Sequence, residues 1–348
     1  MKLNIELRTS PHLRKTHSVE TIMRNVVYAL LPIACFAVYQ FGISALALLL
    51  TVVASCLLTE ALFNYLGDRP QTLSDYSAVI TGILLALTLP PGFPLWMGAV
   101  AGFIAIGLGK SLFGGIGYNL FNPALVGRAF VQAAFPVAIT TWTPAYAANR
   151  FVEFIPTTLT LPFTEPADVA AWSESVAVDA YSGATPLALQ KFEGVTTPAL
   201  DLFTGMSAGS AGETSALLIL LCGAYLVARR MMDWRIPVGI LATVALLSWL
   251  LHLAAPQSNP GPLFMLFSGG LMLGAVFMAS DMVASPVTPL GVWLYAALIG
   301  VVTVIIRLYG GLSEGVMYAI LLGNAMSPLI EQITQPRAYG HARGRSKS

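Results

Sequence analysis

Charged side chains are scarce in this chain: Asp, Glu, Lys and Arg make up 10% of its 348 residues, whereas apolar residues make up 56%. Soluble domains carry about 25% charged residues, so the composition excludes an ordinary soluble protein. Apolar runs that approach or exceed the roughly 20 residues needed to cross a bilayer recur along the whole length. The sequence therefore predicts an all-α polytopic membrane protein.

Cysteine is also rare, and its spacing excludes several kinds of redox centre. Cys35, Cys56 and Cys222 lie far apart, each inside an apolar run. Without C-x-x-C spacing they indicate neither a disulfide framework nor an iron–sulfur or zinc site, and the scattered histidines indicate no metal site. The chain also has no P-loop and no Gly-x-Gly-x-x-Gly after a strand. The sequence therefore offers no nucleotide-binding or iron–sulfur motif of its own.

Basic residues are few, and their distribution matters more than the net charge of +1. No basic tract occurs outside the two termini, which argues against nucleic acid as a partner. The first 24 residues are polar and basic, and they lack the h-region and cleavage site of a signal peptide. Because Lys and Arg are enriched on the cytoplasmic side, we expect this end to be retained and to face the cytoplasm.

The chain does contain a long series of apolar runs, and two of them are interrupted. The runs cover about 25–42, 43–64, 76–89, 95–109, 118–136, 214–228, 236–254, 262–280, 290–307 and 314–332. The third stops at residues 89–94, which contain three prolines, and the eighth at residues 280–289, which contain two. A helix cannot continue through either segment, so we expect broken or tilted helices there.

The two halves of the chain resemble each other weakly. Each has a proline-broken segment, a span, a Gly-Gly pair and an Asn-x-x-x-Pro motif, namely Gly114-Gly115 and Asn119–Pro123, then Gly310-Gly311 and Asn324–Pro328. With five membrane passes in each half, the second half begins on the opposite side of the membrane from the first, as in an inverted-topology repeat. We expect about ten transmembrane helices in two inverted five-helix repeats.

The long polar stretch between the halves is expected outside the membrane. Residues 138–213 hold eight acidic residues but only Arg150 and Lys191 as basic ones. If both termini are cytoplasmic, ten passes place 14 of the 18 Lys and Arg residues, including Lys110, on the cytoplasmic side. Arg307 is then expected on the outer side, and Arg128 within the membrane. The expected parts are a cytoplasmic segment (1–24), a first repeat (25–137), a periplasmic loop (138–213), a second repeat (214–333) and a cytoplasmic tail (334–348).

One stretch of the loop contains a candidate functional side chain, that of Thr185. In Asp179-Ala180-Tyr181-Ser182-Gly183-Ala184-Thr185-Pro186, Gly183 can adopt a positive φ, Asp179 and Ser182 can bond the local backbone, and Pro186 fixes φ. The stretch predicts a tight turn that presents the hydroxyl of Thr185 outward. On these grounds alone, a solvated loop threonine without a function is the simpler interpretation.

At Asp179 and at Ser182-Gly183-Ala184-Thr185 the sequence resembles a family of membrane flavin subunits. The family comprises the RnfD subunits of Rnf complexes and the NqrB subunits of Na+-translocating NADH:quinone reductases. Residues 117–130 and 280–289 also resemble family segments, so the resemblance covers nearly the whole chain. The later segment differs from the commoner Thr-Asp-x-Val-Thr-Ser-Pro form at Ser280 and Ala284.

The resemblance implies a covalent flavin. In the family, a flavin transferase outside the cytoplasm links FMN through a phosphoester to the last residue of the Ser-Gly-Ala-Thr motif, which is Thr185 here. Asp179, Ser182, Gly183 and Ala184 would complete that cofactor-binding motif. Related quinone-reductase subunits also hold a noncovalent riboflavin, and the resemblance allows one in this chain.

Charged residues within the apolar runs have two interpretations each. Arg128 lies mid-span and needs a partner, which is either a carbonyl or carboxylate in a structural pair or a flavin whose anionic reduced form it stabilises. Asp281, at the second helix break, either caps the next helix or contacts a cation or flavin. Glu60 lies close enough to the cytoplasmic end to snorkel, and we expect no role for it.

The function implied by the resemblance is that of an electron carrier in the Rnf complex. That complex couples electron transfer between ferredoxin and NAD to movement of Na+ or H+ across the bacterial inner membrane. The chain would be a subunit of this translocase without catalytic activity alone. Its partners would be the other Rnf subunits (A, B, C, E and G), the flavin transferase and the lipid bilayer.

A solute channel or secondary transporter of inverted-repeat build is the rival interpretation. The urea-transporter fold, to which the family is similar, is an example, and topology alone does not separate the two. The motif Asp-x-x-Ser-Gly-Ala-Thr favours the electron carrier, because a channel does not need it. A purely structural membrane anchor is disfavoured by Arg128 and Asp281.

The charge distribution yields a test of topology. A reporter protein fused after residue 175 should be active on the periplasmic side, and one fused at the C-terminus should be active in the cytoplasm, because the basic residues cluster on the inner side. Paired phosphatase and fluorescent-protein fusions measure this. A cytoplasmic signal at residue 175 would contradict the ten-pass arrangement.

Overall fold

A computed structural model describes residues 18–164, 169, 172, 185–205, 209–213, 215–256 and 259–336. Within these residues all regular secondary structure is helical. Five of the described helices are long and apolar enough to cross a membrane: α1 (Val19–Phe41), α2 (Ile43–Leu66), α11 (Arg235–Ala254), α14 (Pro289–Tyr309) and α15 (Val316–Thr334). The prediction of an all-helical membrane protein is confirmed at this level.

The first half of the chain contains the expected runs as helices of unequal length. After α1 and α2 come η1 (Leu73–Asp75), α3 (Ser77–Leu87), α4 (Leu95–Ile106), η2 (Gly107–Ser111), α5 (Pro123–Ala134) and α6 (Pro136–Thr140). The α1–α2 hairpin turns at Gly42, which has φ +74° and lies so close to the Arg150 carbonyl that a Cβ would collide with it. Helix α1 starts at Val19 and not at residue 25, because the Ser18 hydroxyl caps it by accepting from the Thr21 amide at 3.2 Å.

Helix α3 is a short, broken helix, as its prolines predict. It ends at Leu87, and its last carbonyls would lack partners in a membrane interior. A distant loop supplies them: the amide of Gly212 donates to the Leu87 carbonyl at 2.8 Å, and the amide of Ala211 donates to the Leu89 carbonyl at 3.2 Å. The loop comes so near that a Cβ at Gly212 would clash with the Leu87 side chain. Residues 209–213 are thereby fixed against the end of α3.

The second half begins with short helices and continues with a second broken element. The short helices are α8 (Pro186–Ala188), η3 (Leu189–Glu193) and α9 (Ala199–Thr204), and α10 (Ala216–Ala228) and α11 follow. The run at 262–280 is divided into α12 (Pro262–Phe267), α13 (Leu271–Leu273) and η4 (Gly274–Met278). The division falls at Ser268–Gly270, where Gly269 has φ +62°.

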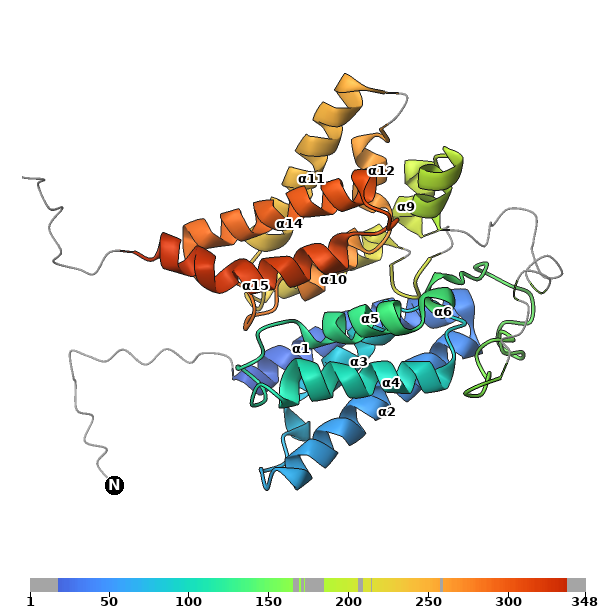
Figure 1. Ribbon diagram of the computed structural model, residues 1–348, viewed down its shortest axis with the longest axis vertical. Coiled ribbons are helices and arrows are strands. Elements are labelled where there is room, and N and C mark those ends of the chain that lie inside the picture. The colour runs from blue at the N-terminus through green and yellow to red at the C-terminus, as the bar shows by residue number, and fades with distance from the viewer. Residues whose placement is uncertain are drawn as a thin grey trace, which may run out of the picture.

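The helices form two bundles that lie one above the other in Figure 1, with α1–α6 in the lower and α10–α15 in the upper. Helices α1 and α10 pack together between them. The order of contacts is alike in both: α2 packs on α3 and α4 and α4 packs on α5, while α11 packs on α12 and α14 and α14 packs on α15. The start of α1 and the end of α15 lie on one side of the molecule, and residues 141–164 and α9 lie on the other (Figure 1).

Glycines set the close approach of helices within each bundle. A Cβ at Gly82 would lie 2.7 Å from the Cα of Val53, and one at Gly300 would lie 2.7 Å from the Cβ of Thr243. Small residues at crossings are typical of membrane helices, because lipid offers no hydrophobic driving force and packing contacts must hold the helices together. Large apolar side chains such as Leu58 and Trp249 remain exposed on the outer faces, as expected for surfaces that contact lipid.

The α4–α5 crossing provides a test of this packing. Replacing Gly127 by Val should destabilise the protein by about 1–3 kcal/mol, the usual cost of overpacking, because even a Cβ would lie 2.7 Å from the Ala101 carbonyl oxygen and 2.8 Å from the Ala105 Cβ. The thermal midpoint in detergent measures the loss. Gly311→Val is the matched control, since a Cβ there meets nothing within 4 Å. Equal midpoints for the two variants would contradict close packing at Gly127.

Candidate functional site

Thr185, the predicted attachment residue, begins the short helix α8. It is the N-cap of that helix, and its Oγ1 accepts a hydrogen bond from the Ala188 amide at 3.2 Å. The side chain is half-buried. The other motif residues, Asp179, Ser182, Gly183 and Ala184, lie outside the described residues.

Two contacts fix α8 and η3 to the second bundle. Leu187 is 5% exposed and packs with Leu202 of α9 and Phe264 of α12. Lys191 extends its ammonium group to the end of α14, where it donates to the carbonyls of Arg307, Gly310 and Leu312 at 3.0, 2.6 and 2.7 Å. These are carbonyls at the C-terminus of a helix, which need donors from elsewhere. The helical segment α8–η3, which follows Thr185, is therefore anchored at Leu187 and at Lys191.

A small cavity of about 30 Å³ lies against Thr185. Its wall also includes Trp142, Ser210, Glu213 and Glu314. A cavity needs about 10–15 Å³ for one water molecule, so this one has room for a water or two between the hydroxyl and the carboxylates. It is too small for a flavin ring.

Arg128 of α5 holds both carboxylates of this cavity. Its Nη1 donates to Oε1 of Glu213, and its Nη2 donates to Oε2 of Glu314, each at 2.8 Å. Arg128 is 7% exposed, and the Glu213 residue is 8% exposed. The structural interpretation of Arg128, a pair with a carboxylate, is confirmed. Because α5 belongs to the first bundle and Glu314 to the α14–α15 turn of the second, the pair also joins the two bundles.

Glycines let the backbone come close to the two carboxylates. Gly212 places Glu213 by its contact with α3, and the amide of Gly270 donates to Oε1 of Glu314. A Cβ at Gly270 would collide with both Glu213 and Glu314. The charged side chains of the cluster therefore lie next to the break between α12 and α13 of the second bundle.

Arg307 completes this cluster from α14. The charge pattern predicts that it lies on the non-cytoplasmic side of the membrane, and its side chain is buried in the protein at 4% exposure. Its Nη1 donates to the Met265 carbonyl at 2.6 Å and its Nη2 to the Ser268 carbonyl at 2.9 Å. It is buried because α12 ends inside the protein, where its last carbonyls need donors.

The electrostatic environment of Glu213 is unusual. Glu213 lies in the loop before α10, outside the helices. Burial raises the pKa of its carboxyl group to about 7, and the neighbouring Glu314 contributes in the same direction while Arg128 opposes them. Ionisation of this carboxylate is therefore balanced near neutral pH.

Asp281 lies in a different place from Arg128. Its Oδ1 accepts from the Val283 amide at 3.1 Å, while Thr288 caps α14 by accepting from the Gly291 amide at 3.2 Å. The interpretation of Asp281 as the cap of the next helix is therefore wrong. Its side chain lines a cavity of about 120 Å³ with other polar residues, namely Ser77, Lys110, Asn119, Asn122 and Ser280.

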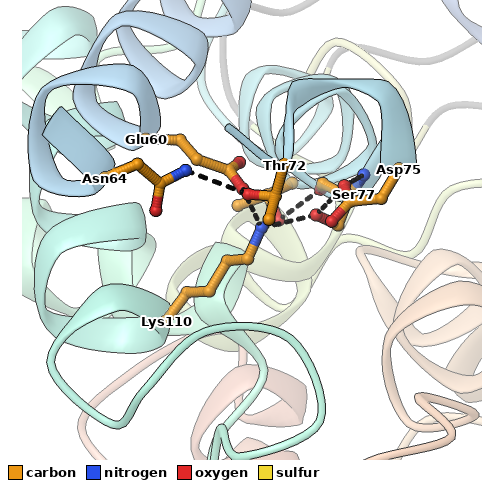
Figure 2. A network of polar contacts seen from close by, with 7 residues as sticks. Glu60, Asn64, Thr72, Asp75, Ser77 and Lys110 are labelled. Atoms are coloured by element: carbon orange, nitrogen blue, oxygen red, sulfur yellow. Dashed lines mark hydrogen bonds and ion pairs between the residues drawn. The ribbon is translucent and has the colours of Figure 1, made fainter. Parts of the chain in front are cut away.

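Glu60 and Lys110 form a second buried ion pair, which corrects one prediction. Glu60 is 2% exposed, so it does not snorkel, and Lys110 is 4% exposed. Lys110 Nζ donates to Oε1 of Glu60 at 2.6 Å and to Oγ of Ser77 at 2.5 Å. Figure 2 shows the ammonium group between Glu60 and Ser77, with Thr72 on the Glu60 side. The residues before α3 cover the end of α2 and remove both side chains from water.

The sequence pattern does not reveal the two carboxylates that pair with Arg128. Glu213 is one of eight acidic residues of the loop, and Glu314 lies between two apolar runs. Both residues stand beside a glycine at the edge of an apolar run, in Gly212-Glu213 and Glu314-Gly315. This local signal marks the two positions, and a buried Arg128 requires anionic partners, but nothing in the sequence matches these carboxylates to it.

The chain matches the NQR2, RnfD, RnfE family over residues 6–340. It is similar to the D subunit of the proton-translocating ferredoxin:NAD(+) oxidoreductase complex of Clostridium ljungdahlii, with 39% identity over 99% of this chain and 98% of the relative. It is 42% identical to the D subunit of the Na(+)-translocating ferredoxin:NAD(+) oxidoreductase complex of Acetobacterium woodii, over 97% and 96%. It is also 42% identical to the D subunit of the ion-translocating oxidoreductase complex of Stutzerimonas stutzeri, over 94% of each chain.

The arrangement around Arg128 yields a stability test. Arg128→Leu should leave membrane insertion intact, because insertion favours the loss of a charge, yet it should destabilise the fold by about 3–5 kcal/mol, since two buried carboxylates lose their partner. The thermal midpoint in detergent measures the effect. Arg69→Leu, at an exposed position, is the control, and a midpoint for Arg128→Leu as high as that of the control would argue against the buried pair.

Proposed function

We propose, from the premise that this chain belongs to the NQR2, RnfD, RnfE family, that it is the RnfD-type subunit of an ion-translocating ferredoxin:NAD+ oxidoreductase complex. Relatives named for this subunit are similar over nearly the full length of both chains. The chain works as one subunit of a translocase that couples electron transfer to Na+ or H+ movement, and it is not catalytic alone.

Its part in the complex is to carry electrons on FMN bound covalently to Thr185. The observation that supports this is the position of the Thr185 hydroxyl, half-buried at the start of an anchored helix and bordering the charged cluster. An ester oxygen keeps lone pairs, so the hydrogen bond from the Ala188 amide can persist after attachment. The residues present are compatible with a phosphoester at this atom.

The surroundings of Thr185 also constrain the flavin ring. The adjoining cavity, at about 30 Å³, is far below the roughly 300–1,000 Å³ of pockets that enclose cofactor-sized ligands. The ring would therefore have to lie outside this cavity, whose wall includes Glu213 and Glu314. When bound, FMN supplies one- and two-electron chemistry, while the protein holds it in place and sets the charge beneath it.

The rest of the electron path is divided among partners. The chain lacks nucleotide and iron–sulfur motifs, so ferredoxin and NAD are handled by the other Rnf subunits (A, B, C, E and G). A noncovalent riboflavin in this chain stays a prediction without an assigned position. The 120 Å³ cavity at Asp281 is smaller than pockets of that class.

The topology proposed with this function is ten spans in two inverted repeats, in the bacterial inner membrane. Its support is the like order of helix contacts in the two bundles and the presence of one short, broken element in each, α3 and α12–α13. The start of α1 and the end of α15 share a side, opposite residues 141–164 (Figure 1), which agrees with cytoplasmic termini and a periplasmic flavin loop. The flavin transferase would act on that outer side.

Thr185→Ala should abolish the covalent flavin, because the hydroxyl oxygen that forms the phosphoester is lost. In-gel flavin fluorescence of the denatured chain, from cells that express the transferase, measures attachment, and mass spectrometry of the peptide Asp179–Lys191 locates it. Thr185→Ser should retain some attachment.

Ser182→Ala is the matched control, since it removes a hydroxyl three residues earlier in the same motif. It should weaken recognition by the transferase at most. An unmodified wild-type peptide from these cells would refute the flavin proposal and favour a channel or transporter of the same build.

A further inference from the structure

The charged cluster next to Thr185 has no net formal charge when all its members are ionised. Its members are Arg128, Arg307, Glu213 and Glu314, two of each sign. Arg307 stands across the Gly269–Gly270 turn and attracts both carboxylates. Among the described residues that line the cavity, Glu213 and Glu314 are the only charged ones. The described lining of the cavity therefore offers no cation to an additional negative charge at Thr185.

The two carboxylates differ in how strongly they are held in the ionised form. Glu314 accepts from the backbone amide of Gly270 in addition to Arg128, and its side chain is 18% exposed. Glu213 accepts from Arg128 and lies beside the Ser210 hydroxyl, and its side chain is 4% exposed. Hydrogen bonds to a carboxylate stabilise its charge and burial opposes it. The deep burial of Glu213 therefore favours its protonated form.

A route for that proton is also present. The cavity borders Thr185, Ser210 and both carboxylates, and it has room for a water or two. Water there can pass a proton to Glu213. Because the Thr185 hydroxyl and the Glu213 carboxyl group border the same cavity, the carboxyl group would respond to the charge of a cofactor attached at Thr185.

We propose that Glu213 is a proton-binding site coupled to the redox state of the flavin on Thr185, an inference that rests on the proposed function. One electron enters from the donor side of the complex, and one proton from bulk solvent, relayed by the cavity water, binds a carboxylate oxygen of Glu213. The O–H bond that forms is broken again when the electron passes on, and the proton returns to water. The total charge around Thr185 is unchanged at each stage.

The direction of the pH dependence follows from this coupling. Below about pH 7 Glu213 is already protonated, so it adds no pH dependence to the flavin potential. Above that pH, reduction must draw in a proton, and the potential falls as the pH rises. The contribution approaches about 59 mV per tenfold change in proton concentration for one proton and one electron.

Redox titration of the covalent flavin in the intact complex, below and above pH 7, tests the proposal. Glu213→Gln should remove the bend in the plot of potential against pH near neutrality, because an amide does not ionise in this range. Glu213→Asp should keep a bend, since it keeps the carboxyl group. A bend in Glu213→Gln as large as in the wild type would overturn the proposal.

Two further variants sharpen the result. Glu314→Gln removes the negative neighbour, so the bend should move to lower pH; an unmoved bend would count against the cluster as its source. Glu193→Gln changes an exposed carboxylate on η3 and should leave the plot as in the wild type. A flattened plot in this control would show that the effect is not specific to Glu213.

The outcomes also separate this inference from the proposed function. In-gel flavin fluorescence is measured on every variant before titration. Absence of covalent flavin from the wild type would refute the proposed function itself, whereas an unaltered bend in a flavin-loaded Glu213→Gln complex would refute only the proton site. If Glu213→Gln does not fold, the retained bend of Glu213→Asp and the shifted bend of Glu314→Gln carry the test, and failure of either would overturn the inference.

Discussion

A guanidinium in the interior of a membrane protein must be neutralised, and much of this structure follows from how Arg128 meets that demand. Its two carboxylate partners come from the loop before α10 and from the α14–α15 turn, both far from α5 in the sequence. Both must reach the interior, so the backbone there has to be irregular. The ion pairs thereby fix the first bundle to the second at the place where Thr185 approaches the charged interior.

Irregular backbone inside a membrane protein leaves carbonyls without partners, and each break here receives donors from a distant segment. The amides of residues 211 and 212 donate hydrogen bonds to carbonyls at the end of α3. Arg307 donates to carbonyls at the end of α12, and Lys191 donates to carbonyls at the end of α14. These donors also position the functional parts. The amides bring Glu213 to Arg128, and Lys191 holds the helix that begins at Thr185.

In the proposed electron carrier, Thr185 therefore lies at the start of an anchored helical segment, and the charged cluster lies next to it. The cavity beside Thr185 admits water but is too small for a cofactor. The second buried pair, Glu60 and Lys110, stands near the start of α3, away from Thr185 (Figure 2). Each bundle thus buries a basic residue close to its broken element.

The sequence by itself determined the helical class, the positions of the apolar runs, the breaks at the prolines and the Thr185 motif, because composition, hydrophobic length and proline chemistry act locally. It also required that Arg128 have a partner. It could not identify Glu213 and Glu314, since partners so far apart in the chain are matched only by the packing of α5 against the second half. For the same reason it wrongly predicted that Glu60 snorkels to the membrane surface, and it did not show that Lys110 and Arg307 are buried. Only the tertiary structure shows which helix ends are covered and which carbonyls need donors.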